Sequence, residues 1–246
     1  STVRRRAGSS NAVSTWRALR GAPRSMRAVT PTPAATAAHI AVTLAVLALL
    51  PTLVVVCTSF LKIAIVLSLL RNALGVQQIP PNLALYAMAL LMSAYIMAPV
   101  GQNMYEQVVA LPQATRSIEN TLNAMMQGAE PLREFLHKHS ERGHRDFFVQ
   151  TAREMWSADL AAKVREKDFM VLLPSFMLTE MTEAFKIGFL LFLPFVVIDL
   201  IVSNILLAMG MMMVSPVMIS MPLKLFLFVM LDGWTRLIRG LILTYA

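Results

Sequence analysis

Three ionisable residues lie close together in an otherwise apolar stretch of this chain: Glu180, Glu183 and Lys186. The two glutamates are three positions apart, so in a helix they share one face. An ionisable side chain at the centre of a bilayer costs roughly 2.5–3.5 kcal/mol on insertion scales, and it therefore needs a partner or a wet cavity. The chemistry could be a proton relay or an ion pair that fixes helix packing. We favour the ion pair, with Lys186 as the obvious local partner of Glu183.

Three more charges lie singly in apolar sequence, and they raise the same question of a partner. Lys62 is far from any acidic residue in the chain, whereas Asp199 and Lys224 could pair across helices or between subunits. We therefore predict that one set of charges holds helices and subunits in register: Lys62, Glu183, Lys186, Asp199 and Lys224.

A second titratable cluster contains histidines and glutamates: His137, His139, His144, Glu134 and Glu141. Such residues could be metal ligands, but the basic residues among them are more typical of a solvated helix end. We predict no metal, no cofactor and no catalytic residue, so the protein is not expected to be an enzyme. The single cysteine, Cys57, cannot form an intrachain disulfide, and we expect it to be a small buried apolar side chain.

Six methionines fall within thirteen residues: Met209, Met211, Met212, Met213, Met218 and Met221. Methionine is unbranched and polarisable, so a cluster of it forms an apolar surface that deforms easily. Gly210 and Pro216 lie beside the cluster and are expected to shape a loop. We predict that Met209, Met211, Met212 and Met213 form part of a deformable apolar surface on this loop, past which something has to push. The alternative is that these methionines fill gaps between helices.

The elements that carry these residues are predicted to be membrane helices. Hydrophobic residues make up 57% of the chain and charged residues 15%, against roughly 45–50% and 25% in soluble domains. The excess lies in four apolar blocks, residues 40–70, 72–105, 169–198 and 200–231. Each block exceeds the roughly 20 apolar residues that a spanning helix needs. The fold class is therefore predicted to be all-α, an integral membrane protein.

The sequence between the second and third blocks is polar. Residues 106–168 contain nine Lys or Arg and ten Asp or Glu, and we predict a small water-facing helical domain there. It separates a first helical hairpin, residues 40–105, from a second, residues 169–246, which carries the methionine-rich loop.

Residues 1–39 differ again, because they contain seven arginines and no acidic residue. We interpret them as a disordered basic arm or a leader, and translation from Met26 is an equal alternative. Nucleic-acid binding is disfavoured, since only Trp16 supplies an aromatic side chain among the arginines.

Four motifs follow one another along the chain, and together they resemble a known family. They are TSFLK at Thr58–Lys62, LRNALGVQQIPPN at Leu70–Asn82, LPSFMLTEMTEAFKIG at Leu173–Gly188 and LPFVVIDLIVSNILLAMGMMMVSP at Leu193–Pro216. This order resembles the export-gate R subunit of type III secretion systems (SctR, HrcR or YscR), whose flagellar counterpart is FliP. The resemblance covers about residues 40–246 and favours the injectisome branch.

The resemblance implies a core subunit of a protein export gate in the bacterial inner membrane. Five copies would assemble with the S and T subunits, in contact with the U switch subunit, the V subunit and membrane lipid. Unfolded exported proteins would pass through the gate, and Met211, Met212 and Met213, with Met209 in support, would seal it. No nucleic acid is implied. The helices would be bent hairpins, and we expect breaks at the prolines in or beside the blocks: Pro51, Pro99, Pro174 and Pro194.

The basic arm and the resemblance disagree about orientation. The positive-inside rule keeps the arm in the cytosol and, counting spans, places residues 106–168 there too. The resemblance implies a periplasmic location for residues 106–168. We follow the resemblance, because the positive-inside rule no longer applies to the arginines of residues 1–39 if they form a leader that is removed or if translation starts later.

Two other functional classes are weaker. A small secondary transporter, or another ion-conducting membrane protein, would also carry charges at membrane depth, but the second half does not resemble the first. An intramembrane hydrolase would need a nucleophile with its base or a metal pair, and the apolar blocks contain no histidine beyond His39.

Overall fold

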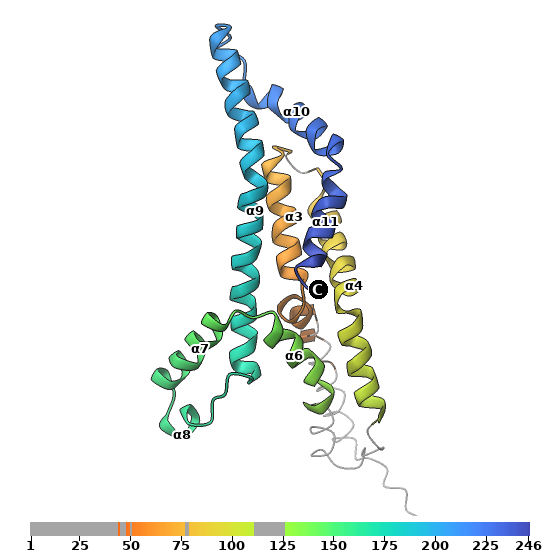
Figure 1. Cartoon of the computed structure of the whole chain (residues 1–246), viewed down its shortest axis with the longest axis vertical. Coiled ribbons are helices and arrows are strands. Elements are labelled where there is room, and N and C mark those ends of the chain that lie inside the picture. The colour runs from red at the N-terminus through yellow and green to blue at the C-terminus, as the bar shows by residue number, and fades with distance from the viewer. Residues whose placement is uncertain (1–43, 45–47, 50, 77–78, 111–125) are drawn as a thin grey trace, which may run out of the picture. The chain divides into compact units, whose positions relative to one another are not determined.

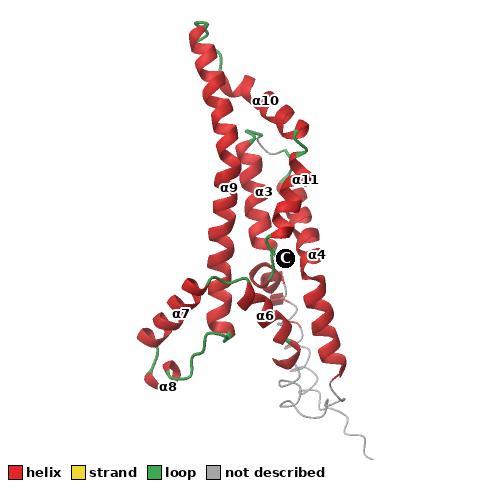
Figure 2. Ribbon diagram, in the orientation of Figure 1, coloured by secondary structure: helices red, strands yellow, loops and turns green. Residues whose placement is uncertain are grey.

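The computed structural model describes residues 44, 48–49, 51–76, 79–110 and 126–246. The described residues from 51 onward form one compact unit, which is described below. Its labelled elements are α3 (Phe60–Ala73), α4 (Asn82–Ala110), α6 (Glu130–Lys138), α7 (Arg142–Met155), α8 (Ala158–Ala161), α9 (Phe169–Ala208), α10 (Pro216–Met230) and α11 (Gly233–Leu243) (Figure 1). The described ranges contain no strand (Figure 2). The predicted all-α fold is therefore confirmed.

The helices also confirm the membrane character. Two of them are long and apolar enough to cross a bilayer, Asn82–Gln107 within α4 and Phe169–Ala208, which is α9. Two bent pairs pass the same test together. They are Pro51–Cys57 with α3, bent by 80°, and α10 with α11, bent by 65°. By length and composition the described residues thus provide two spans, or up to four.

Three of the four prolines where we expected breaks do not interrupt a helix. Helix α4 continues through Pro99, and α9 continues through Pro174 and Pro194. A proline inside a helix costs about 3 kcal/mol, whereas ending a helix in apolar surroundings leaves several backbone groups unsatisfied at several kcal/mol each. Continuing the helix is therefore the cheaper solution.

One helix runs across the boundary that the sequence suggested between the third and fourth apolar blocks. Helix α9 is 40 residues long and includes Asp199, the charge that divides the two blocks. The turn of the second hairpin comes after Ala208 instead. A single charge interrupts an apolar run in the sequence, but the helix can continue through Asp199 because Lys224 neutralises that carboxylate.

The core is built around α3, which packs against both α9 and α4 (Figure 1). Its buried face repeats at helical spacing, with Ile63, Val66, Leu67 and Leu70 at 1% exposure or less. Gly188 of α9 permits a close approach, because a Cβ at this position would lie 2.2 Å from a side-chain carbon of Leu69.

A second apolar cluster joins the polar segment to α9. Phe135 and Leu136 of α6 pack with Leu172 and Phe176 of α9 and with Tyr245 near the C-terminus. Helix α6 can do this because Pro131, Phe135 and Leu136 lie on its buried side, while Glu134 and Lys138 are exposed. This contact places α6 beside the buried charges.

Candidate functional site

Lys62 lies at the centre of a buried charge cluster. Its side chain is only 1% exposed, and Nζ lies 3.0 Å from Oε1 of Glu180 and 2.5 Å from Oε2 of Glu183. Glu180 is fully buried, whereas 44% of the Glu183 side chain is exposed. One ammonium from α3 thus holds two carboxylates from successive turns of α9.

Tyr245 completes the cluster from the C-terminus. Its hydroxyl donates a hydrogen bond to Oε2 of Glu180, and the Lys62 Nζ lies 4.2 Å from the centroid of its ring. A cation above an aromatic face is attracted to the ring, most strongly when water is excluded. The two contacts join the end of the chain to α3 and α9.

His139 borders this cluster through its aromatic neighbours. Its ring centroid lies 5.2 Å from that of Tyr245 and 4.6 Å from that of Phe135. Burial lowers the pKa of His139 to about 4, and the charges of Lys138 and Lys62 add to the effect. The imidazole is therefore neutral at physiological pH.

The arrangement corrects the local pairing that the sequence suggested. Glu183 forms its salt bridge with Lys62, 121 positions away, rather than with Lys186. Lys186 is exposed, and it takes part in no salt bridge within the described part of the chain. The buried ammonium of Lys62 attracts the Glu183 carboxylate more strongly than the exposed ammonium of Lys186 does, because less water screens the buried pair.

Asp199 and Lys224 form a second ion pair, between α9 and α10. The Lys224 Nζ lies 2.6 Å from Oδ2 of Asp199 and also donates to the carbonyl oxygen of Ala73 at 3.2 Å. Ala73 is the last residue of α3, where helical carbonyls lack intrahelical partners. Lys224 is nearly buried, so this one ammonium joins three helices.

The methionine-rich segment forms the turn between α9 and α10. Gly210 adopts a left-handed φ of 75°. Its N–H donates to the Leu207 carbonyl, and the Met211 N–H donates to that of Leu206. This is the Schellman pattern, which uses glycine because a left-handed residue without Cβ carries no steric penalty. Pro216 then begins α10 at a position that suits proline.

The turn exposes its methionines. Met209, Met211, Met212 and Met213 are 56%, 48%, 82% and 101% exposed. These side chains do not fill gaps between the helices of their own chain. Figure 1 shows the turn at the far end of α9 from α6 and α7.

The histidines are separated by different partners. His137 lies 3.6 Å from Glu166, and Nδ1 of His144 lies 2.9 Å from the Thr179 hydroxyl. Among the residues that the structure describes, no three His, Cys, Asp or Glu side chains converge as metal ligands. Cys57 is buried.

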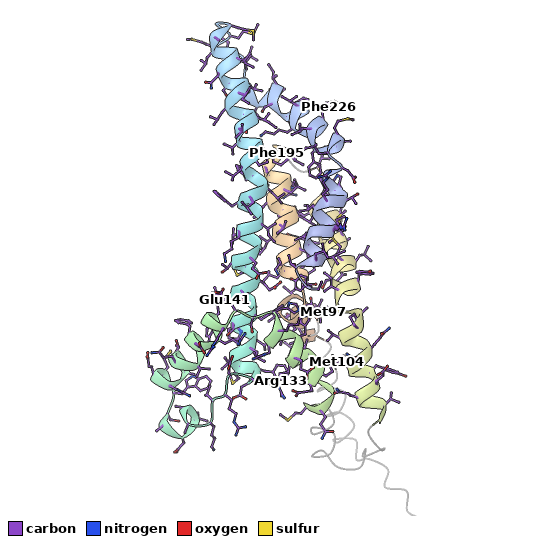
Figure 3. The ribbon with its side chains drawn as sticks, in the orientation of Figure 1. Met97, Met104, Arg133, Glu141, Phe195 and Phe226 are labelled. Atoms are coloured by element: carbon purple, nitrogen blue, oxygen red, sulfur yellow. The ribbon has the colours of Figure 1, made fainter. Side chains whose placement is uncertain are left out.

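Two residues of this region were not singled out from the sequence. Arg145 is nearly buried, and its Nε lies 2.7 Å from Oε1 of Glu166, which lowers the pKa of that carboxyl. It also donates to the His137 carbonyl at 3.2 Å, so it holds the turn between α6 and α7. Arg133, Glu141 and the other side chains of α6 and α7 are drawn in Figure 3. The carboxylate partners of Arg145 and Tyr245, which are Glu166 and Glu180, lie 21 and 65 positions away, so no helical spacing in the sequence indicates either contact.

Comparison with known proteins gives one consistent family. The FliP family matches residues 43–241. The chain is 49% identical over 208 residues to the Yop proteins translocation protein R of Yersinia pestis, covering 85% of this chain and 96% of that protein. It is 44% identical over 202 residues to the harpin secretion protein HrcR of Erwinia amylovora, covering 82% and 93%. It is 42% identical over 205 residues to the virulence protein YscR of Salmonella typhimurium, covering 81% and 93%.

Proposed function

The chain belongs to the FliP family, and from this we propose that it is a membrane subunit of a type III protein secretion apparatus. Its relatives include a Yop translocation protein, a harpin secretion protein and a virulence protein. In this role the protein forms part of the wall of the conduit through which unfolded proteins leave the bacterial cytosol. It acts as a structural subunit rather than as an enzyme.

The exposed methionine turn is the observation that carries the finer proposal, a seal. A passage wide enough for an unfolded chain would dissipate the proton gradient if it stayed open. A ring of methionines from several copies closes such a passage, because an apolar constriction excludes ions by dewetting and thioether side chains repack around any side chain that passes. Met211, Met212 and Met213 supply the ring, and the hydrogen-bonded turn at Gly210 holds them at the end of α9.

The buried charges support a rigid wall behind this seal. Lys62 joins α3 to α9, and Lys224 joins α9, α10 and α3. Removing one partner of a buried pair is costly because the other charge remains buried. The turn can therefore deform while the helices behind it keep their register.

The assembly around the subunit follows from the family resemblance. Five copies of this chain combine with the S and T subunits in the inner membrane, and the U and V subunits adjoin them. The chain is multi-pass, and residues 106–168 face the periplasm. Exposed Lys186 is available for contacts between subunits.

The seal is tested by changing the three methionines together. We expect the assembled complex with Met211→Ala, Met212→Ala and Met213→Ala to conduct ions in planar bilayers, while the parent complex stays closed. The matched control changes two exposed methionines outside the turn, Met155→Ala and Met170→Ala. An assembled triple variant that conducts no more than the parent refutes the seal, and failure to assemble favours a packing role.

A further inference from the structure

Helix α11 presents two arginines on one exposed face. Arg236 and Arg239 are three positions apart and both exposed, while Leu237 and Leu241 face the core. Neither guanidinium takes part in a salt bridge within the described ranges. The nearest acidic residue in the sequence, Asp232, accepts a hydrogen bond from Thr235 at 3.0 Å. The guanidinium groups of Arg236 and Arg239 can therefore bind an anion from outside the chain.

An apolar groove lies beside the first arginine. Its volume is about 450 Å³, and α9, α10 and α11 all contribute to it. Most of its lining is aliphatic or aromatic, including Leu191, Phe195, Phe228 and Leu237, and Arg236 is the only charged residue. This volume lies within the roughly 300–1,000 Å³ of ligand pockets.

A second apolar recess lies beside the other arginine. It measures about 330 Å³ and is lined by Ile238, Ile242 and Leu243 together with Thr235 and Arg239. The two arginines therefore each adjoin an apolar hollow, and the pair of cations lies on the helix that the two hollows share.

We propose that this face of α11 binds an anionic phospholipid, with the phosphate at Arg236 and Arg239 and an acyl chain in each hollow. The planar guanidinium matches a phosphate with two parallel hydrogen bonds. Basic pockets between membrane helices favour anionic head groups. One phosphate with two apolar chains matches this combination of two adjacent guanidinium groups with an apolar hollow beside each of them.

Gly240 provides a way to block the groove without disturbing the arginines. It lies in the groove lining, and a Cβ built there meets no atom within 4 Å. It is helical, so a larger residue also has a better helix propensity. We therefore expect Gly240→Leu to occupy part of the groove and to leave the fold intact.

The test is native mass spectrometry of the delipidated full chain with dioleoyl phosphatidylglycerol or dioleoyl phosphatidylcholine. We expect the parent to prefer the anionic lipid. Arg236→Gln and Arg239→Gln should each lower its affinity for that lipid about fivefold, and the double variant should lose the preference. Gly240→Leu should weaken binding of both lipids. The control is Arg153→Gln, which removes an exposed arginine of α7 and should change nothing.

Three results overturn the proposal. The parent binds both lipids equally, the double variant still prefers the anionic lipid, or Arg153→Gln lowers the affinity for that lipid as much as Arg236→Gln does. If the parent shows no lipid preference, and the double variant expressed together with the other secretion subunits no longer co-purifies with them, a protein carboxylate is the true partner. Circular dichroism and gel filtration establish that each variant is folded. Arg236→Lys keeps the positive charge but not the planar guanidinium, so its affinity for the anionic lipid should lie between those of the parent and Arg236→Gln. The lipid site is independent of the methionine seal.

Discussion

Removing the central cation of the buried cluster should destabilise the protein more than any other single charge change. Lys62→Met replaces the ammonium by an apolar group of similar length and leaves Glu180, which is fully buried, with only the Tyr245 hydroxyl as a partner. It also leaves the carboxylates of Glu180 and Glu183 facing each other across the vacated position. Both effects act in the same direction, because each disfavours a buried negative charge.

The size of the effect follows from the burial of the pair. Removing one partner of a buried ion pair costs about 3–5 kcal/mol. For a chain of 150–250 residues, each kcal/mol lowers Tm by roughly 2–4 °C, so we expect a decrease of roughly 6–20 °C. The exposed pair Arg142 and Asp146 is the contrast, with 84% and 64% of the two side chains exposed. Arg142→Gln should therefore lower Tm by less than about 2 °C.

The assay is thermal unfolding of the detergent-purified chain, followed by the fluorescence of its tryptophans. A rescue variant makes the test specific: Lys62→Met with Glu180→Gln and Glu183→Gln removes all three charges, and it should recover a large part of the lost Tm. The reasoning is refuted if Lys62→Met unfolds within 2 °C of the parent. It is also refuted if the triple variant is no more stable than the single one.

Three further outcomes follow from individual contacts. Asp199→Leu leaves the Lys224 ammonium with the Ala73 carbonyl alone, and it should lower the free energy of unfolding by about 1–3 kcal/mol. This is less than for Lys62→Met, because Asp199 is partly exposed. Adding Lys224→Met should restore part of the lost Tm. His139 has its pKa lowered to about 4, so between pH 6.5 and 4 the unfolded chain binds the extra proton and stability falls as the pH falls; His139→Phe, measured over the same range, should show a smaller fall, and equal slopes would contradict this. Gly188→Leu should separate α3 from α9 and lower recovery of folded protein, since even a Cβ there lies 2.2 Å from a Leu69 carbon; normal recovery would show that the two helices can move apart.

The sequence predicted the features that depend on local composition and spacing. Long apolar runs require helices in a bilayer, because only internally hydrogen-bonded segments are stable there. The turn between α9 and α10 was predictable for a similar reason. Gly210 permits the left-handed conformation and Pro216 suits the first position of a helix, so the two residues delimit the loop without help from distant contacts.

The tertiary structure decided which charges meet and where the helices bend. Glu183 has a lysine three positions away, yet it pairs with Lys62 of α3, because the packing of α3 on α9 buries that ammonium beside it. Asp199 lies within a continuous helix because Lys224 reaches it from α10. Sequence spacing gives the neighbours along one helix, but partners on different helices depend on how those helices pack, and that packing is a property of the whole fold.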